Sequence, residues 1–233
     1  MSRTITFRND TIGVNMKAGG GNAYYILETI TVLAAVSFLV IRKVQEDRRS
    51  RSTRKAALKT MTNGNISSRF EPHLQSGNCI VAATCNILWY HGKNGFPELI
   101  EGIDFVELEG RIDTIINSKG GYANNNVPET VEEYVHTYTS YQVEVKNKWY
   151  PKFSDVKKAS AKNPCLLGFA AGSEGAGPKV GHMTACVYAA ESEGKKLVGV
   201  MNGHKTEIVY FEWSKFNDFM SEFIFSRDTD EEP

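Results

Sequence analysis

The feature that most constrains this chain is residues 75–92, a polar turn that delivers a cysteine to the start of a helix. Gly77-Asn78 forms the turn. The small and apolar residues after it recur at helical spacing until Gly92 supplies a stop. Cys79 is therefore expected in the first helical turn. The unpaired N–H groups and the positive dipole end at that position favour a thiolate, which is a strong nucleophile.

A histidine and an asparagine follow the cysteine, each at one end of a predicted strand. Residues 164–170 and 183–190 have the composition of strands on either side of a Gly-rich loop, so His182 is expected at the entrance of the second strand. The next apolar run, 196–201, ends at Asn202-Gly203. A thiol nucleophile needs a base to take its proton, and His182 is the candidate base.

In these residues the chain resembles the papain-like cysteine peptidases, and specifically compact bacterial members such as staphopain, streptopain and the peptidases that process double-glycine leaders. The resemblance is spread over short motifs between residues 71 and 225. It implies a nucleophile, a general base, an imidazole-orienting residue and an oxyanion donor, and these roles fall on Cys79, His182, Asn202 and Gln75.

The resemblance includes a Gly-Gly-Tyr segment ahead of a helical run. Papain relatives pair this segment with the substrate backbone, which implies that Gly120 and Gly121 contact a peptide or protein substrate. The four cysteines, at 79, 85, 165 and 186, have no spacing suited to zinc. We therefore expect no metal, and the sequence indicates no other cofactor. A disulfide between Cys165 and Cys186 is one possibility in an oxidising compartment.

Helical patterns come first in the chain and strand patterns later. Apolar residues recur at helical spacing in the regions 79–91, 98–118 and 130–138, whereas short apolar runs separated by tight turns follow from residue 164 onward. This order predicts an α+β fold. The resemblance implies its two-lobed papain-like form, with an N-terminal helical lobe packed on a C-terminal antiparallel β-sheet.

Composition and the resemblance together divide the chain into five segments. We expect a flexible tail over residues 1–22, a membrane-spanning hydrophobic helix over 23–41 and a basic linker over 42–64. The peptidase domain follows over 65–226, and an acidic tail over 227–233.

The membrane segment Ala23–Ile41 is almost entirely apolar and nearly long enough to cross a bilayer, with Tyr24 and Tyr25 at one end and Arg42-Lys43 at the other. Glu28 lies near the end of the span, where its carboxyl can reach the headgroups. These features predict a single-pass membrane protein. A buried helix or a propeptide helix is the alternative.

Charge also bears on topology and partners. Basic residues are more frequent after the span than before it, so the positive-inside rule puts the C-terminal body in the cytoplasm. Peptidases of this type are often exported, so the resemblance favours the opposite side. The basic linker carries no interleaved aromatic residues, so we do not expect nucleic-acid binding. The sequence indicates no oligomeric state.

Each candidate residue also has a purely structural interpretation. Asn202-Gly203 is a common hairpin turn, Gly120-Gly121 is a common turn, and Gln75 is an ordinary polar loop residue. His204, two residues past Asn202, is a rival base. Besides a peptidase, two functions stay open: an amidase, transglutaminase or acyltransferase on the same scaffold, and an inactive papain-like binding module.

Overall fold

The computed structural model describes residues 3–7, 10–14, 21–60, 66–75, 77–173, 181–213 and 217–227. They form two compact units, Met1–Ser52 and Thr53–Pro233. The larger unit combines helices with an antiparallel sheet, so the predicted α+β class is confirmed. The predicted acidic tail, apart from Arg227, lies outside the described residues.

The first unit contains a two-stranded antiparallel sheet, β1 (Arg3–Phe7) and β2 (Asp10–Val14), and most of the long helix α1 (Gly21–Thr60). The flexible tail expected over residues 1–22 lies partly outside the described residues and stays a prediction. The expected linker is helical as far as Thr60. The end of α1 belongs to the second unit, where Ala57 is fully buried and its carbonyl accepts a hydrogen bond from the Tyr188 hydroxyl.

Within the part of the chain that the structure describes, no helix has both the length and the apolar character needed to cross a bilayer. The side chains of residues 21–31, where the expected span begins, lie outside the described residues. The membrane helix over 23–41 stays a prediction.

The second unit is built on a six-stranded sheet whose strands pair only in antiparallel fashion, in the order β3-β8-β4-β5-β6-β7. The strands are β3 (Tyr141–Trp149), β4 (Cys165–Phe169), β5 (His182–Ser192), β6 (Lys195–Met201), β7 (Val209–Glu212) and β8 (Asn217–Arg227). Strand β8 lies between the edge strand β3 and β4, so the last strand is not adjacent in the sheet to the strand that precedes it in the chain.

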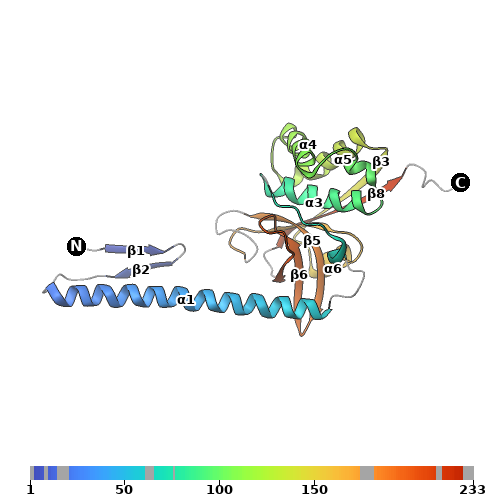
Figure 1. Ribbon diagram of the computed structural model, residues 1–233. Coiled ribbons are helices and arrows are strands. Elements are labelled where there is room, and N and C mark those ends of the chain that lie inside the picture. Colours follow the sequence, from blue (N-terminus) through green and yellow to red (C-terminus); the bar gives the residue numbers. More distant parts are fainter. Residues whose placement is uncertain are drawn as a thin grey trace. The chain divides into compact units, whose positions relative to one another are not determined.

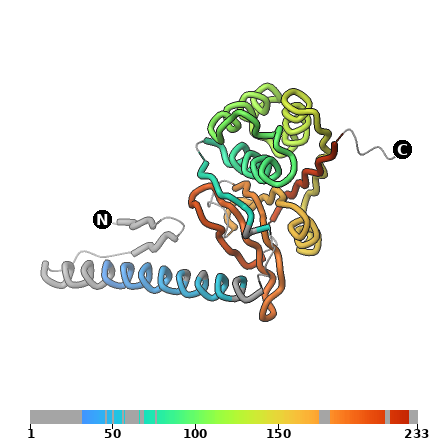
Figure 2. Tube along the Cα trace, turned by 45° about the vertical axis from the view of Figure 1, so that its right-hand side comes forward, coloured from blue at the N-terminus to red at the C-terminus, as the bar shows by residue number. Residues whose placement is uncertain are grey.

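Among the described residues, five further helices and two short 3-10 helices lie before or between the strands of this sheet. They are α2 (Ile66–Arg69), α3 (Cys79–Lys93), η1 (Pro97–Ile100), α4 (Phe105–Ser118), η2 (Asn124–Asn126), α5 (Val127–Tyr138) and α6 (Phe153–Ser160). Figures 1 and 2 show α3, α4 and α5 grouped on one side of the sheet.

At the strand β4 both faces of the sheet are buried. Cys165, Leu167 and Phe169 pack with α6, whereas Leu166 packs with the helices on the opposite face. Successive side chains of a strand alternate between faces, so a strand with apolar residues at every position needs a cover on each side. The continuous apolar run in the sequence is thereby explained.

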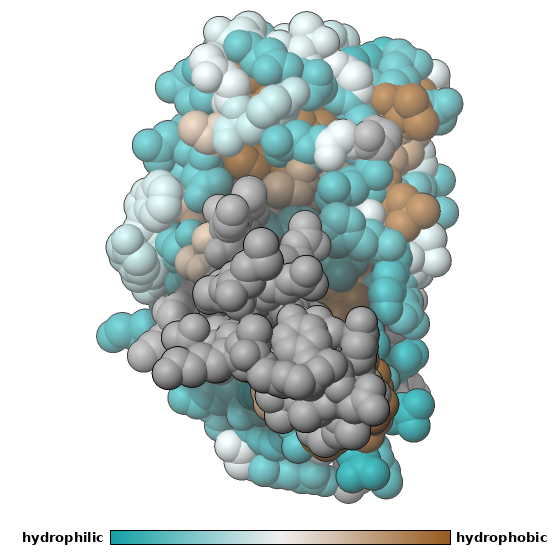
Figure 3. Space-filling view, turned by 90° about the vertical axis from the view of Figure 1, so that its left-hand side faces the viewer, coloured by the Kyte–Doolittle hydropathy of each residue, from teal (hydrophilic) through white to brown (hydrophobic). Residues whose placement is uncertain are grey.

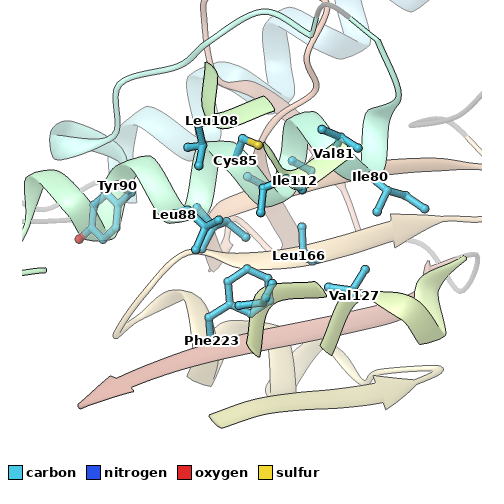
Figure 4. Packing of buried hydrophobic residues seen from close by; sticks show 14 of the residues in the cluster. Ile80, Val81, Cys85, Leu88, Tyr90, Leu108, Ile112, Val127, Leu166 and Phe223 are labelled. Atoms are coloured by element: carbon cyan, nitrogen blue, oxygen red, sulfur yellow. The ribbon is translucent and has the colours of Figure 1, made fainter. Parts of the chain in front are cut away.

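Helix α3 is the central element of the larger core. Figure 4 shows Leu88 near Leu166 of β4 and Phe223 of β8, which lie between the helix and the sheet. Leu88 and Leu166 are fully buried, and truncating such a leucine to alanine typically costs about 2–5 kcal/mol. The core thus fixes the helix that begins with Cys79.

Figure 3 shows a mainly hydrophilic surface with small separate apolar areas on the face in view.

Candidate active site

The N-terminus of α3 is built by an asparagine cap. Asn78 has extended backbone angles, and its side-chain oxygen accepts a hydrogen bond of 2.8 Å from the Ile80 N–H, as helix-capping residues do. Cys79 is therefore the first helical residue, as predicted. Among the described residues no acceptor meets the Cys79 N–H, which is one of the unpaired donors at a helix start.

The Cys79 sulfur points toward the sheet. Its Sγ accepts a hydrogen bond of 3.5 Å from the main-chain N–H of Met183, the second residue of β5. The side chain is half-buried, so it keeps access to solvent. A helix start and a strand N–H thus converge on one sulfur atom, and both favour negative charge there.

His182 is the first residue of β5, directly before Met183. Its Nε2 lies 2.8 Å from the main-chain oxygen of Asn202. A carbonyl oxygen can only accept, so Nε2 carries the proton and Nδ1 has a free lone pair when the ring is neutral. The ring of His204 stacks on that of His182, with centroids 5.0 Å apart and planes inclined by 11°. The imidazole is thus fixed by one hydrogen bond and one stacked face.

Cys79 and His182 share a pocket of about 170 Å³. It lies where the start of α3 meets β4, β5 and β8, and its lining consists of Cys79, Ile80, Asn124, Gly168, Phe169, Gly181, His182, Met183 and Asp218. The two residues are 103 positions apart in the chain, yet the fold brings the predicted nucleophile and the predicted base to one cavity. This arrangement permits proton transfer from a thiol to an imidazole.

Asn202 contacts the imidazole through its main chain. Its side-chain oxygen accepts a hydrogen bond of 3.1 Å from the His204 N–H, which closes the turn after β6 in the manner of an Asx turn. The resemblance assigned the orienting role to Asn202 without naming the atom. In the structure the same residue supplies it from the carbonyl group, because the turn uses the side chain.

Gln75 lies beside this turn rather than in the pocket. Its N–H donates to the Gly203 carbonyl at 2.9 Å, and its side-chain nitrogen donates to the Gly77 carbonyl at 3.3 Å. A Cβ at Gly203 would lie 2.6 Å from the Gln75 side-chain oxygen, so glycine is required for this close packing. The structure therefore brings Gln75 to the Asn202 turn, and the oxyanion role stays a prediction.

Gly120 and Gly121 form a tight turn after α4. Their φ angles of +97° and +102° belong to a region that favours glycine. The Gly121 carbonyl accepts hydrogen bonds from the Ala123 N–H and the Asn126 side chain, at 2.8 and 2.7 Å. Neither glycine lines the pocket around Cys79. Their role in substrate binding stays a prediction.

The residues that follow this turn do reach the start of α3. Asn124 lines the pocket that holds Cys79. Tyr122 lines a second hollow of about 400 Å³, together with Gly77 and Asn78. Two cavities therefore flank the residue that carries the sulfur.

Asp218 is the pocket residue that the sequence interpretation missed. It lies on β8, and its carboxyl is half-buried. Desolvation by burial raises the pKa of this carboxyl above its usual value. Its only sequence signal is an acidic residue next to an apolar strand, Phe219 and Met220, which by itself indicates no ligand.

The other three cysteines are fully buried in the core. Burial raises the pKa of the Cys85 thiol well above its ordinary value. Cys165 and Cys186 are partners in the β4–β5 register and are free thiols, and their mutual hydrogen bond and burial raise the pKa of Cys165. Among the described residues, no group of three His, Cys, Asp or Glu side chains is placed to hold a metal ion.

Comparison with models of known protein families gave no match, and a search of curated proteins gave none either. The function is therefore inferred from the pocket and its side chains.

Proposed function

We propose that this protein is a papain-like cysteine peptidase that cleaves peptide bonds through an acyl-enzyme on Cys79. The observation that carries the proposal is the shared pocket: the Cys79 sulfur accepts the Met183 N–H, and the neighbouring His182 ring is oriented by the Asn202 carbonyl. A structural cysteine needs neither a free helix-terminal N–H nor a tethered imidazole beside it.

The described architecture supports the papain-like assignment. Helices α3, α4 and α5 form one layer and the antiparallel sheet forms the other (Figure 1). Cys79 comes from the helical layer and His182 from the sheet, as the resemblance implies. The hollows on either side of the α3 start give an extended chain room to pass the sulfur.

The reaction follows from the donors and acceptors at the site. His182 Nδ1 takes the Cys79 proton, and the thiolate adds to the substrate carbonyl. The Cys79 N–H stabilises the oxygen anion that forms, and the Gln75 amide becomes a second donor if its side chain turns away from Gly77. The imidazolium then protonates the leaving amine. In the second step His182 takes a proton from water, the water attacks the thioester, and the acyl group is released as a carboxylic acid while Cys79 is restored.

A thiol-directed label and a peptide cleavage assay test the proposal together. Iodoacetamide should modify Cys79 in the folded protein much faster than the buried Cys85, and mixed fluorogenic peptides should be cleaved. Cys79→Ser should abolish cleavage, and His182→Ala should lower kcat/KM about 10²- to 10⁴-fold, the usual contribution of a general base.

His136→Ala is the matched control, because His136 is an exposed histidine of α5 outside the pocket. It should leave cleavage unchanged. Equal labelling rates for Cys79 and Cys85, together with no cleavage, would point to an inactive binding module. Release of product only when an amine acceptor is added would instead identify a transferase.

A further inference from the structure

Asp218 occupies an irregular position on β8. In the β4–β8 register Gly168 pairs with Phe219 and Phe169 pairs with Asn217, so Asp218 has no partner and the register shifts at this point. An extra residue of this kind is a β-bulge, which turns a side chain out of the regular alternation and is frequent beside active sites. Here the bulge residue is Asp218, whose side chain forms part of the pocket wall.

Gly168 makes room for the Asp218 carboxyl. A Cβ at Gly168 would lie 2.5 Å from Asp218 Oδ1 and 3.1 Å from the Phe219 Cβ. The carboxyl therefore lies against the bare backbone of β4, in the pocket shared with Cys79 and His182. The buried Asn217 side chain donates to the Gly168 carbonyl at 3.4 Å, which helps to hold the bulge.

In the part of the chain that the structure describes, this carboxyl has no cationic partner. Among the described residues no lysine or arginine forms an ion pair with Asp218, and the other ionisable groups in the pocket lining are Cys79 and His182. Partial desolvation of an unpaired carboxylate is unfavourable, as its raised pKa indicates. A cationic group brought by a ligand would supply the missing charge through a short charge-assisted hydrogen bond.

We propose that Asp218 makes the pocket select substrates with a positively charged group next to the scissile bond. This inference rests on the peptidase function proposed above and names its substrate class. The cation is either a lysine or arginine side chain or a free N-terminal amine. The volume of about 170 Å³ suits such a group, since a cavity of about 150 Å³ holds a six-carbon ring.

Matched peptides test the selectivity. Peptides with a blocked N-terminus carry lysine, or norleucine as its uncharged counterpart, at each position around the scissile bond, and a second set has a free N-terminus. The wild-type protein should prefer lysine at one position, or the free amine. Asp218→Asn should lower that preference roughly 10- to 100-fold, the range for a lost hydrogen bond to a charged group, with little change for norleucine.

Glu222→Gln is the control, because Glu222 lies on the same strand but outside the pocket. It should keep the wild-type preference. Asp218→Ser serves as a second variant if the asparagine disturbs the bulge. Unchanged preference in both Asp218 variants, with cleavage intact, would overturn the inference and leave the peptidase proposal standing.

A direct reaction at the sulfur separates the two proposals. Aminoethyl methanethiosulfonate is cationic, methyl methanethiosulfonate is neutral, and both form a mixed disulfide with Cys79 and release a sulfinate. Asp218→Asn should slow only the cationic reagent, relative to Glu222→Gln. An equal ratio of the two rates in wild type and Asp218→Asn refutes the cation site. A Cys79 that reacts with neither reagent refutes the peptidase and the inference built on it.

Discussion

The neutral, buried histidine at the C-terminal end of α3 should make the protein sensitive to acid. His91 lies in the last turn of α3, with 3% of its surface exposed, among the rings of Tyr90, Phe96 and Phe225. Its Nε2 has no hydrogen-bond partner among the described residues. Desolvation by burial lowers its pKa from 6.5 to about 4.

The sign and size of the effect follow from linkage. Above about pH 7 His91 is neutral in both states and contributes no pH dependence. Below pH 6.5 His91 binds a proton in the unfolded chain but stays neutral in the folded protein. The free energy of unfolding therefore falls as the pH falls. At 1.36 kcal/mol per pH unit, the interval down to about 4 corresponds to a loss of about 2 kcal/mol at pH 5 and about 3 kcal/mol at pH 4.

The measurement compares wild type with His91→Phe, which keeps an aromatic ring in the same packing but does not titrate. Urea unfolding followed by tryptophan fluorescence between pH 8 and pH 4 gives the two free energies of unfolding. The free energy of unfolding of His91→Phe minus that of wild type should be constant above pH 7 and should then increase by about 3 kcal/mol down to pH 4. His136→Phe, at an exposed site of α5, should follow wild type. Parallel curves for wild type and His91→Phe down to pH 4 would refute the reasoning.

Three further predictions concern the pocket. Asn202→Ala should lower kcat/KM less than about tenfold, because the main-chain carbonyl that orients His182 remains; a loss as large as that of His182→Ala would assign the role to the side chain. Gly168→Ala should weaken the preference for cationic substrates, because the new Cβ displaces the Asp218 carboxyl; an unchanged lysine-to-norleucine ratio would contradict this. Asp218→Asn should raise the Tm at pH 7 but not below about pH 3, where the carboxyl is protonated in both states; a Tm gain of equal size at both values would show that charge is not the cause.

The sequence predicted the elements that local rules determine. The small and apolar residues after the Gly77-Asn78 turn predict a helix with Cys79 in its first turn, and the structure has that helix beginning at Cys79. The apolar runs after residue 164 predict strands, and β4, β5 and β6 occupy them. Cys79 and His182 could be named because each stands at the end of such an element.

The finer contacts depend on choices that local patterns do not encode. Asn202 has both a side-chain oxygen and a main-chain oxygen at the turn, and which of them meets His182 depends on how the turn closes onto His204. Gln75 precedes Cys79 by four residues, but its backbone pairing with Gly203 directs its side chain to the turn. Asp218 enters the pocket through a bulge, which pattern reading of β8 does not reveal.

The two ends of α3 illustrate how stability and function divide along one helix. Cys85, Ile87 and Leu88 in its middle are fully buried, so packing on both the sheet and α4 fixes the helix axis. At the C-terminal end burial outweighs the dipole, which would favour a protonated His91, and keeps that histidine neutral. At the N-terminal end the N–H of Cys79 has no acceptor among the described residues. A helix whose middle is fixed by packing can keep unpaired N–H groups in its first turn. In the proposed reaction these N–H groups would stabilise the oxygen anion that develops on the substrate.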